Sequence, residues 1–128
     1  MDKGRVNWVI IFGIIGVLLL IIAASVVINA FKKDKYDELA KCLTAKGFTE
    51  YGTYWCGNCE RQKLAFGGSY KYINYVECDE EGENAKPEEC DAKGITGYPT
   101  WITPDGEQIR GFQSMENLAR VSGCELPG

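Results

Sequence analysis

The residues of this chain best suited to carry chemistry are Cys56 and Cys59, in the motif Trp-Cys-Gly-Asn-Cys. Residues 48–54 before them are typical of a strand and those after them of a helix, so Cys56 is expected at a helix N-terminus. Free backbone N–H groups and the positive end of the helix dipole favour a thiolate there. Because the thiolate is the nucleophile, we expect Cys56 to attack or release a substrate and Cys59 to resolve the mixed disulfide.

Three neighbouring features allow a functional and a structural interpretation. Trp55 either shields the thiolate and presents a flat apolar contact, or fills the core. Glu50, six residues before the first cysteine, either moves protons to and from Cys59 or faces solvent at a sheet edge. Pro99, in a Gly-Tyr-Pro-Thr motif, either begins a strand or forms a cis turn. The pattern alone leaves all three pairs open.

A C-x-x-C pair also occurs as half of a zinc site, which needs a second close pair of ligands. Cys78 and Cys90 are twelve residues apart, and the chain contains no histidine. A structural disulfide between Cys56 and Cys59 is the other alternative, although a two-residue loop constrains the unfolded chain little. We therefore expect neither a metal nor a cofactor.

Helices and strands alternate along the part of the chain that holds these residues. The expected helices cover 35–46, 57–66, 87–93 and 115–121, and the expected strands cover 48–54, 72–78, 100–103 and 108–112. Alternation implies parallel pairing, and the Pro-Asp-Gly turn at 104–106 adds an antiparallel hairpin at the edge. The expected fold class is α/β, with a central mixed sheet of about four strands flanked by helices.

The N-terminal part has a different composition, with no charged residue from Val6 to Phe31. A helix of residues 8–31 is about 36 Å long at roughly 1.5 Å per residue, enough to cross a bilayer. A signal peptide cleaved near Ala23 and Ser25 is the alternative. The expected organisation is a tail at 1–7, a transmembrane helix at 8–31, a linker at 32–35 and a domain at 36–126.

Charge and cysteine content narrow the partners and the compartment. The 128 residues carry a net charge of −4, which argues against a nucleic-acid partner. Basic residues flank the apolar segment on both sides, so the positive-inside rule leaves its orientation almost undecided. Six cysteines in the polar part are typical of a compartment where disulfides persist. We expect a single-pass protein of the cell membrane with its C-terminal domain on the extracytoplasmic side, a reduced cytosolic domain being the alternative.

The motifs at 54–59 and 97–100, together with Glu50, resemble the thioredoxin superfamily, including the domains of protein disulfide isomerase. A closer likeness is to the thioredoxin-like domain fused to, or working beside, bacterial vitamin K epoxide reductase homologues. This likeness covers about residues 36–124. The stretches that carry it are 66–70, 75–78, 89–90 and 94–101.

The resemblance implies a thioredoxin fold with Cys56 as nucleophile, Cys59 as resolving thiol and Pro99 in cis. It also implies a quinone-reducing membrane partner of the vitamin K epoxide reductase type, which reoxidises the pair so that disulfides pass to exported proteins. In that family the cysteines matching Cys78 and Cys90 are paired.

The chain departs from the family in three ways. It has one apolar segment, so the quinone-reducing partner is expected to be a separate protein. Asn58 replaces the usual histidine and carries no charge, so we expect a less oxidising pair than Asn58→His would give. Cys42 and Cys124 have no counterpart; by elimination they pair and tie the first helix to the tail, although one of them could equally be a free or interchain thiol.

The expected site consists of two catalytic thiols and the residues around them. The catalytic pair is Cys56 and Cys59, and the supporting residues are Glu50, Trp55, Gly57, Asn58, Tyr98 and Pro99. The expected function is disulfide exchange with exported proteins, in the direction of disulfide donation. A reductase or isomerase of the same fold is the first alternative, because reduction potential decides direction. A redox-inert anchored binding module is the second.

Overall fold

The computed structural model describes residues 3–31 and 33–128. The chain separates into two compact units, Met1–Lys33 and Asp34–Gly128. The expected N-terminal tail (1–7) and linker (32–35) lie partly outside the described residues.

The first unit is a single long helix, α1 (Lys3–Ala30). It contains the apolar stretch Asn7–Ala30, which is long and apolar enough to cross a membrane. A signal sequence near an N-terminus meets the same two criteria. The helix begins before the expected residue 8, since no proline in the preceding residues interrupts it.

The second unit is built on a four-stranded mixed sheet in the order β2-β1-β3-β4. Its strands are β1 (Thr49–Gly52), β2 (Tyr75–Glu77), β3 (Thr100–Ile102) and β4 (Gln108–Arg110). Strand β1 pairs in parallel with β2 and antiparallel with β3, and β3 pairs antiparallel with β4. Four strands flanked by helices, with one N-terminal apolar helix, confirm the expected thioredoxin-like α/β class.

The expectation that the strand at 100–103 would pair in parallel was wrong. Between β2 and β3 the only helix among the described residues is α4 (Pro87–Ala92), which is six residues long. Strand β3 instead enters the sheet antiparallel to β1. The alternation of helices and strands does not fix this direction, because a connection of this length can lead into a strand of either direction.

The remaining helices agree closely with the sequence pattern. They are α2 (Asp37–Ala45), α3 (Gly57–Phe66) and α5 (Met115–Ser122). Helix α5 begins at the expected residue 115, after a cap in which the Ser114 hydroxyl accepts a hydrogen bond from the Asn117 N–H at 3.1 Å. A 3-10 turn, η1 (Gly67–Tyr72), was not expected; it occupies Tyr72 and shortens the strand predicted to begin there.

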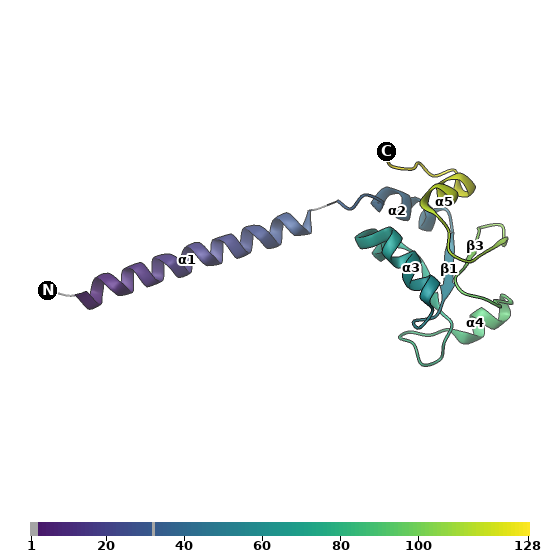
Figure 1. The fold of residues 1–128 in the computed structure, drawn as a ribbon, viewed down its shortest axis with the longest axis horizontal. Coiled ribbons are helices and arrows are strands. Elements are labelled where there is room, and N and C mark those ends of the chain that lie inside the picture. The colour runs from purple at the N-terminus through teal and green to yellow at the C-terminus, as the bar shows by residue number, and fades with distance from the viewer. Residues whose placement is uncertain (1–2, 32) are drawn as a thin grey trace. The chain divides into compact units, whose positions relative to one another are not determined.

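The two faces of the sheet are covered differently, and Figure 1 shows α3 on one side of β1 and α4 on the other. The larger core lies on the α3 side, where α2 and α5 also pack. Its buried residues are Leu39, Ala40, Leu43, Phe48, Phe66, Ile73, Trp101, Met115, Leu118, Ala119 and Cys124. A smaller core on the α4 side contains Tyr51, Val76, Cys78, Cys90 and Ile102.

Helix α3 is held in place by a buried amide. Gln62 is fully buried, and its side chain donates a hydrogen bond to the Gln113 carbonyl at 2.9 Å and accepts one from the Gln113 N–H at 2.8 Å. The Trp101 indole donates to the same Gln62 oxygen at 3.4 Å. Because a buried polar group without partners is costly, this network fixes the position of α3 relative to β3.

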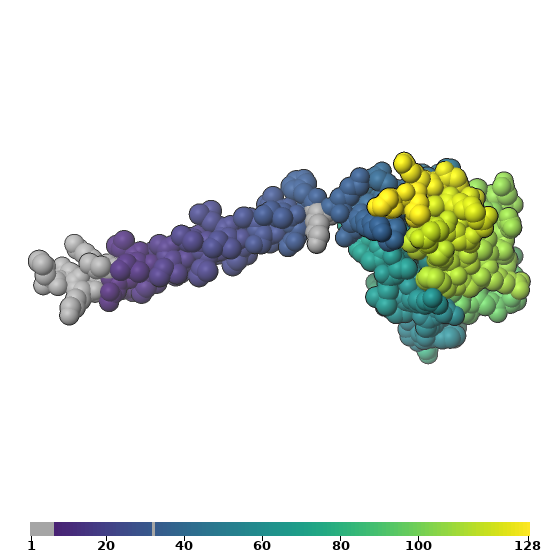
Figure 2. Space-filling view, turned by 45° about the horizontal axis from the view of Figure 1, so that its top comes forward, coloured from purple at the N-terminus to yellow at the C-terminus, as the bar shows by residue number. Residues whose placement is uncertain are grey.

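On the α3 side of the sheet, a disulfide also joins α2 to the segment after α5. Cys42 on α2 is bonded to Cys124, which follows α5, at a sequence separation of 82. Figure 2 shows the C-terminal residues in yellow beside the blue segment that contains α2. The tail is thereby attached to the first helix of the domain.

Candidate active site

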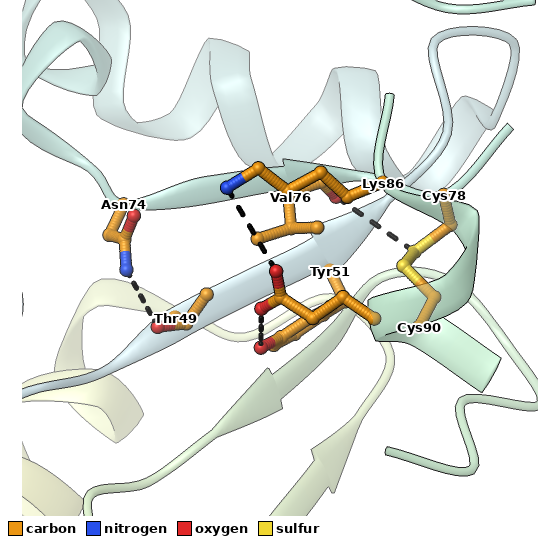
Figure 3. Close-up of polar contacts among 8 residues, drawn as sticks. Thr49, Tyr51, Asn74, Val76, Cys78, Lys86 and Cys90 are labelled. Atoms are coloured by element: carbon orange, nitrogen blue, oxygen red, sulfur yellow. Dashed lines mark hydrogen bonds and ion pairs between the residues drawn. A yellow bond between two sulfur atoms is a disulfide. The ribbon is translucent and has the colours of Figure 1, made fainter. Parts of the chain in front are cut away.

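Two of the six cysteines, all of which lie in the described part of the chain, are free. These are Cys56 and Cys59, whereas Cys78 is bonded to Cys90 and Cys42 to Cys124. Figure 3 shows the Cys78–Cys90 disulfide at the end of β2. The free thiols are therefore confined to one place, the first turn of α3.

Cys56 occupies the N-cap position of α3 and is half-exposed. Its backbone is extended, and its Sγ accepts a hydrogen bond from the Cys59 N–H at 3.2 Å. This is the contact that a helix start offers to its cap residue, and it directs a backbone donor at a sulfur that a substrate can reach. Gly57 and Asn58 complete the first turn and are exposed.

Cys59, one turn later, is only 4% exposed. Its sulfur occupies space left by Gly52 on β1, because a Cβ at Gly52 would lie 2.8 Å from Cys59 Sγ. Burial raises the pKa of the Cys59 thiol well above its ordinary value, and the neighbouring Cys56 sulfur raises it further. The second thiol therefore needs a proton acceptor before it can act as a nucleophile.

Glu50 lies on β1 with none of its surface exposed, which excludes the solvent-facing alternative. Burial raises the pKa of its carboxyl to about 8, opposed by the nearby Tyr70 hydroxyl and Lys63 ammonium. Neither Glu50 oxygen has a partner in hydrogen-bond geometry among the residues that the structure describes. A carboxyl that changes charge near neutral pH, and that raises the pKa of Cys59 electrostatically, is suited to exchange protons with it.

The rim of the site joins the cysteine motif to the proline loop. Trp55 is 60% exposed, so the interpretation of Trp55 as core filler was wrong. Its indole N–H donates to Asp79 Oδ2 at 2.6 Å, and this bond lowers the pKa of Asp79. Its ring contacts that of Tyr98 edge-on, with centroids 6.2 Å apart. The Tyr98–Pro99 peptide bond is cis, and Pro99 is buried.

Three residues at the site had not been recognised from the sequence: Gly52, Tyr75 and Glu77. In the β1–β2 register Glu50 lies beside Tyr75 and Gly52 beside Glu77, and alternate residues of a strand share a face. All four therefore lie on the face that α3 covers. The alternation Tyr-Val-Glu at 75–77 indicates that Tyr75 and Glu77 share one face of the strand. Only the register with β1 shows that this is the face of Glu50 and Gly52.

The arrangement combines an accessible sulfur at a helix start, a buried sulfur one turn later and a buried carboxyl behind it. Two thiols so placed can form a reversible disulfide with each other or exchange one with a substrate. Fold and site together define a thioredoxin-like dithiol protein.

Comparison with known proteins agrees with this class. The chain is 37% identical over 92 residues to the thiol-disulfide oxidoreductase LTO1 of Arabidopsis thaliana, an alignment covering 69% of this chain. This chain spans about a quarter, 24%, of the length of that relative. No protein-family model matches the chain. The chain is thus related to a thiol-disulfide oxidoreductase, and the relationship supports an oxidoreductase role.

Proposed function

We propose that this protein is a membrane-anchored thiol–disulfide oxidoreductase that exchanges disulfides with exported proteins through Cys56 and Cys59. The observation that carries the proposal is the half-exposed Cys56 sulfur at the start of α3, hydrogen-bonded to the Cys59 N–H, while four other cysteines are closed into disulfides. A redox-inert module needs neither an accessible thiol nor a backbone N–H directed at its sulfur.

In the donating direction, the protein begins with a Cys56–Cys59 disulfide. A substrate thiolate attacks Cys56 Sγ, the Cys56–Cys59 bond breaks, and Cys59 leaves with the bonding electron pair and takes up a proton. A second substrate thiolate then attacks the substrate sulfur of the mixed disulfide and releases Cys56. The substrate loses two electrons and gains a disulfide, and the protein ends in the dithiol form.

Glu50 is the proton donor and acceptor for Cys59 in this scheme. When Cys59 leaves, a protonated Glu50 supplies the proton; in the reverse direction the ionised carboxylate removes it. A pKa of about 8 allows both forms near neutral pH. Trp55 and Tyr98 border the approach to Cys56 and offer aromatic contact to the chain of a substrate.

The anchor and the partner complete the proposal. Helix α1 crosses the membrane, and the domain from residue 36 onward lies on the extracytoplasmic side, where its disulfides persist. The two electrons gained from substrate pass to a quinone-reducing membrane protein of the vitamin K epoxide reductase type, which restores the Cys56–Cys59 disulfide.

The test is a stopped-flow reaction of the full chain, in detergent micelles, with a chromogenic aryl disulfide such as Ellman's reagent. The Cys56–Cys59 pair is first reduced, with the other two disulfides left intact. Attack by Cys56 releases one coloured thiolate in a first phase, and attack by Cys59 on the mixed disulfide releases a second.

Cys56→Ser should abolish the fast first phase, a loss of roughly a thousandfold in rate, because a hydroxyl replaces the nucleophile. Cys59→Ser should keep the first phase and lose the second. Slow, equal labelling of Cys56 and Cys59 in the unsubstituted protein would reject the enzyme and favour an inert module. The redox state of the pair in cells, with and without a candidate quinone-linked partner, tests the membrane part of the proposal.

A further inference from the structure

Among the described residues, no hydrogen bond links the buried carboxyl of Glu50 to a group that could pass a proton to solvent. Glu50 is fully buried, and neither of its oxygens has a hydrogen-bond partner among the described residues. Burial also raises the pKa of Glu50 to about 8, so in most molecules at neutral pH the carboxyl is already protonated and cannot take up the Cys59 proton. Every exchange nevertheless moves one proton onto or off Cys59, and that proton must reach solvent.

The structure holds a second carboxyl nearer to the surface, joined to the site by a hydroxyl. Tyr75 donates its hydroxyl hydrogen to Glu77 Oε2 at 2.8 Å, and Glu77 retains 6% exposure. The other Glu77 oxygen accepts the Asp79 N–H at 3.0 Å, in the loop that also anchors Trp55. Gly82 leaves the room that the Glu77 side chain occupies, since a Cβ there would meet Glu77 Cγ.

Gly52 brings this pair to the buried sulfur. The position that its Cβ would take lies 2.8 Å from Cys59 Sγ and 3.3 Å from the Tyr75 hydroxyl oxygen, so the two atoms border the same gap. Catalytic hydrogen bonds are often long in the resting state and shorten only in the reacting complex. A proton transfer between the two groups would require the Cys59 side chain to rotate toward the Tyr75 hydroxyl.

We propose that Tyr75 and Glu77 form a proton route between Cys59 and solvent, working beside Glu50. In resolution, the Cys59 thiol gives its proton to the Tyr75 oxygen while the Tyr75 hydroxyl hydrogen passes to the Glu77 carboxylate. The Cys59 thiolate then attacks Cys56 Sγ, the Cys56–Cys59 bond forms, and the substrate sulfur leaves with its electron pair. Glu77 returns the proton to water. The proposal rests on the oxidoreductase function proposed above.

The charged and titratable groups around the Tyr75 hydroxyl support a relay rather than a base. Burial and the Glu77 carboxylate raise the pKa of Tyr75 above its ordinary value, so the hydroxyl stays protonated and passes a proton through. The groups that face this cluster from the neighbouring elements are Glu50, Tyr54, Cys59, Lys63, Tyr70 and Glu77. A relay needs no ionisation of the tyrosine.

The matched control is on the opposite face of the same sheet. Tyr51 on β1 also donates its hydroxyl to a glutamate, Glu89, at 2.9 Å, but it lies beside the Cys78–Cys90 disulfide (Figure 3). Tyr51→Phe therefore removes a tyrosine–carboxylate bond of the same kind without touching Cys59. Glu77→Gln keeps an oxygen that can accept from Tyr75 but cannot take up the proton.

The experiment is the two-phase reaction with Ellman's reagent on the full chain, followed across pH in H2O and in D2O. Tyr75→Phe and Glu77→Gln should each slow the second phase by about tenfold or more at neutral pH and leave the first phase unchanged. Their defect should shrink as pH rises, because hydroxide then removes the Cys59 proton directly, and the solvent isotope effect should change. Tyr51→Phe should behave as the unsubstituted protein.

Three outcomes overturn the route: an unchanged second phase in both variants, an equal slowing by Tyr51→Phe, or a defect that is the same at every pH, as a packing change would give. Failure of the oxidoreductase proposal is distinguishable, because there the first phase itself is absent in the unsubstituted protein.

Discussion

The two faces of the sheet use the same residue types for different ends. Each face holds a tyrosine whose hydroxyl donates to a glutamate, Tyr75 to Glu77 on the α3 side and Tyr51 to Glu89 on the α4 side. Near that tyrosine each face also holds a pair of cysteines; the Cys42–Cys124 disulfide of the α3 side, which joins α2 to the C-terminal tail, is a separate pair. On the α3 side the pair is free and lies at a helix start, whereas on the α4 side Cys78 and Cys90 are bonded.

The difference lies in what surrounds each pair. Cys56 has a helix N-terminus and solvent access, and Cys59 has an unpartnered buried carboxyl behind it. Cys78 and Cys90 lie in an apolar cluster with Val76 and Ile102, an environment that disfavours a charged sulfur but accommodates the uncharged disulfide. Reactivity is thus set by placement rather than by residue type.

The largest expected effect concerns Glu50, the fully buried carboxyl of the α3 face whose oxygens have no hydrogen-bond partner among the described residues. The pKa of Glu50 rises from an ordinary 4.5 to about 8, so the folded state holds this proton more tightly than the unfolded chain does. The stability that the protonated Glu50 contributes is therefore fully present below pH 4.5 and is lost progressively as pH rises to about 8. Glu50→Gln should remove that loss. Relative to the unsubstituted protein, the free energy of unfolding of the variant should be higher at pH 8 than at pH 4 by roughly 4 kcal/mol.

Denaturant unfolding at the two pH values, with the disulfides intact, measures this gain. Glu89→Gln is the matched control, because it removes a carboxylate from the other face, and it should give no gain. Glu50→Gln should also slow the second phase of the reaction with Ellman's reagent. A variant with the same pH dependence of stability as the unsubstituted protein would mean that Glu50 is not the group responsible.

The next largest effect concerns the closed pair on the α4 face. Replacing both Cys78 and Cys90 with serine opens a loop with a sequence separation of 12. Loop-closure entropy predicts a loss of about 3 kcal/mol in the free energy of unfolding. The first phase of the reaction should survive in the folded variant. Loss of that phase without loss of fold would show instead that the α4 pair takes part in exchange.

The smallest effect tests the close approach of β1 to the buried sulfur. Gly52→Ala places a methyl 2.8 Å from Cys59 Sγ and 3.1 Å from a Tyr75 ring carbon, so the sulfur must move. We expect a loss of about 1–3 kcal/mol in stability, as for overpacked cores, and a slower second phase. Gly57→Ala, where a methyl meets no described atom within 4 Å, controls for the stability effect of an added methyl. Equal stabilities of the two variants would contradict the crowding argument.

Much of the fold could be predicted because the local sequence patterns that begin and end the helices agree with one another. Helices α3, α4 and α5 begin at 57, 87 and 115, as the sequence pattern had indicated, and Pro87 stands in the first turn of α4 while Ser114 caps α5. The η1 turn and the shorter β2 were missed, because residues 67–72 carry strand-like aromatics that the 3-10 turn uses for packing against α2 and α3. The antiparallel entry of β3 was missed because strand direction depends on the pairing of β3 with β1, which is a contact between residues far apart in the chain.

The sequence by itself determined the chemistry available: two cysteines at a helix start, an acidic residue one strand earlier, a proline loop and an apolar N-terminal helix. Local propensity and spacing suffice for these, since each depends on neighbours a few residues away. Only the tertiary structure decided which cysteines pair, that Trp55 is exposed while Glu50 is buried, and that Tyr75 and Glu77 share a face with Cys59. These depend on strand register and on burial, which arise from contacts between residues far apart in the chain.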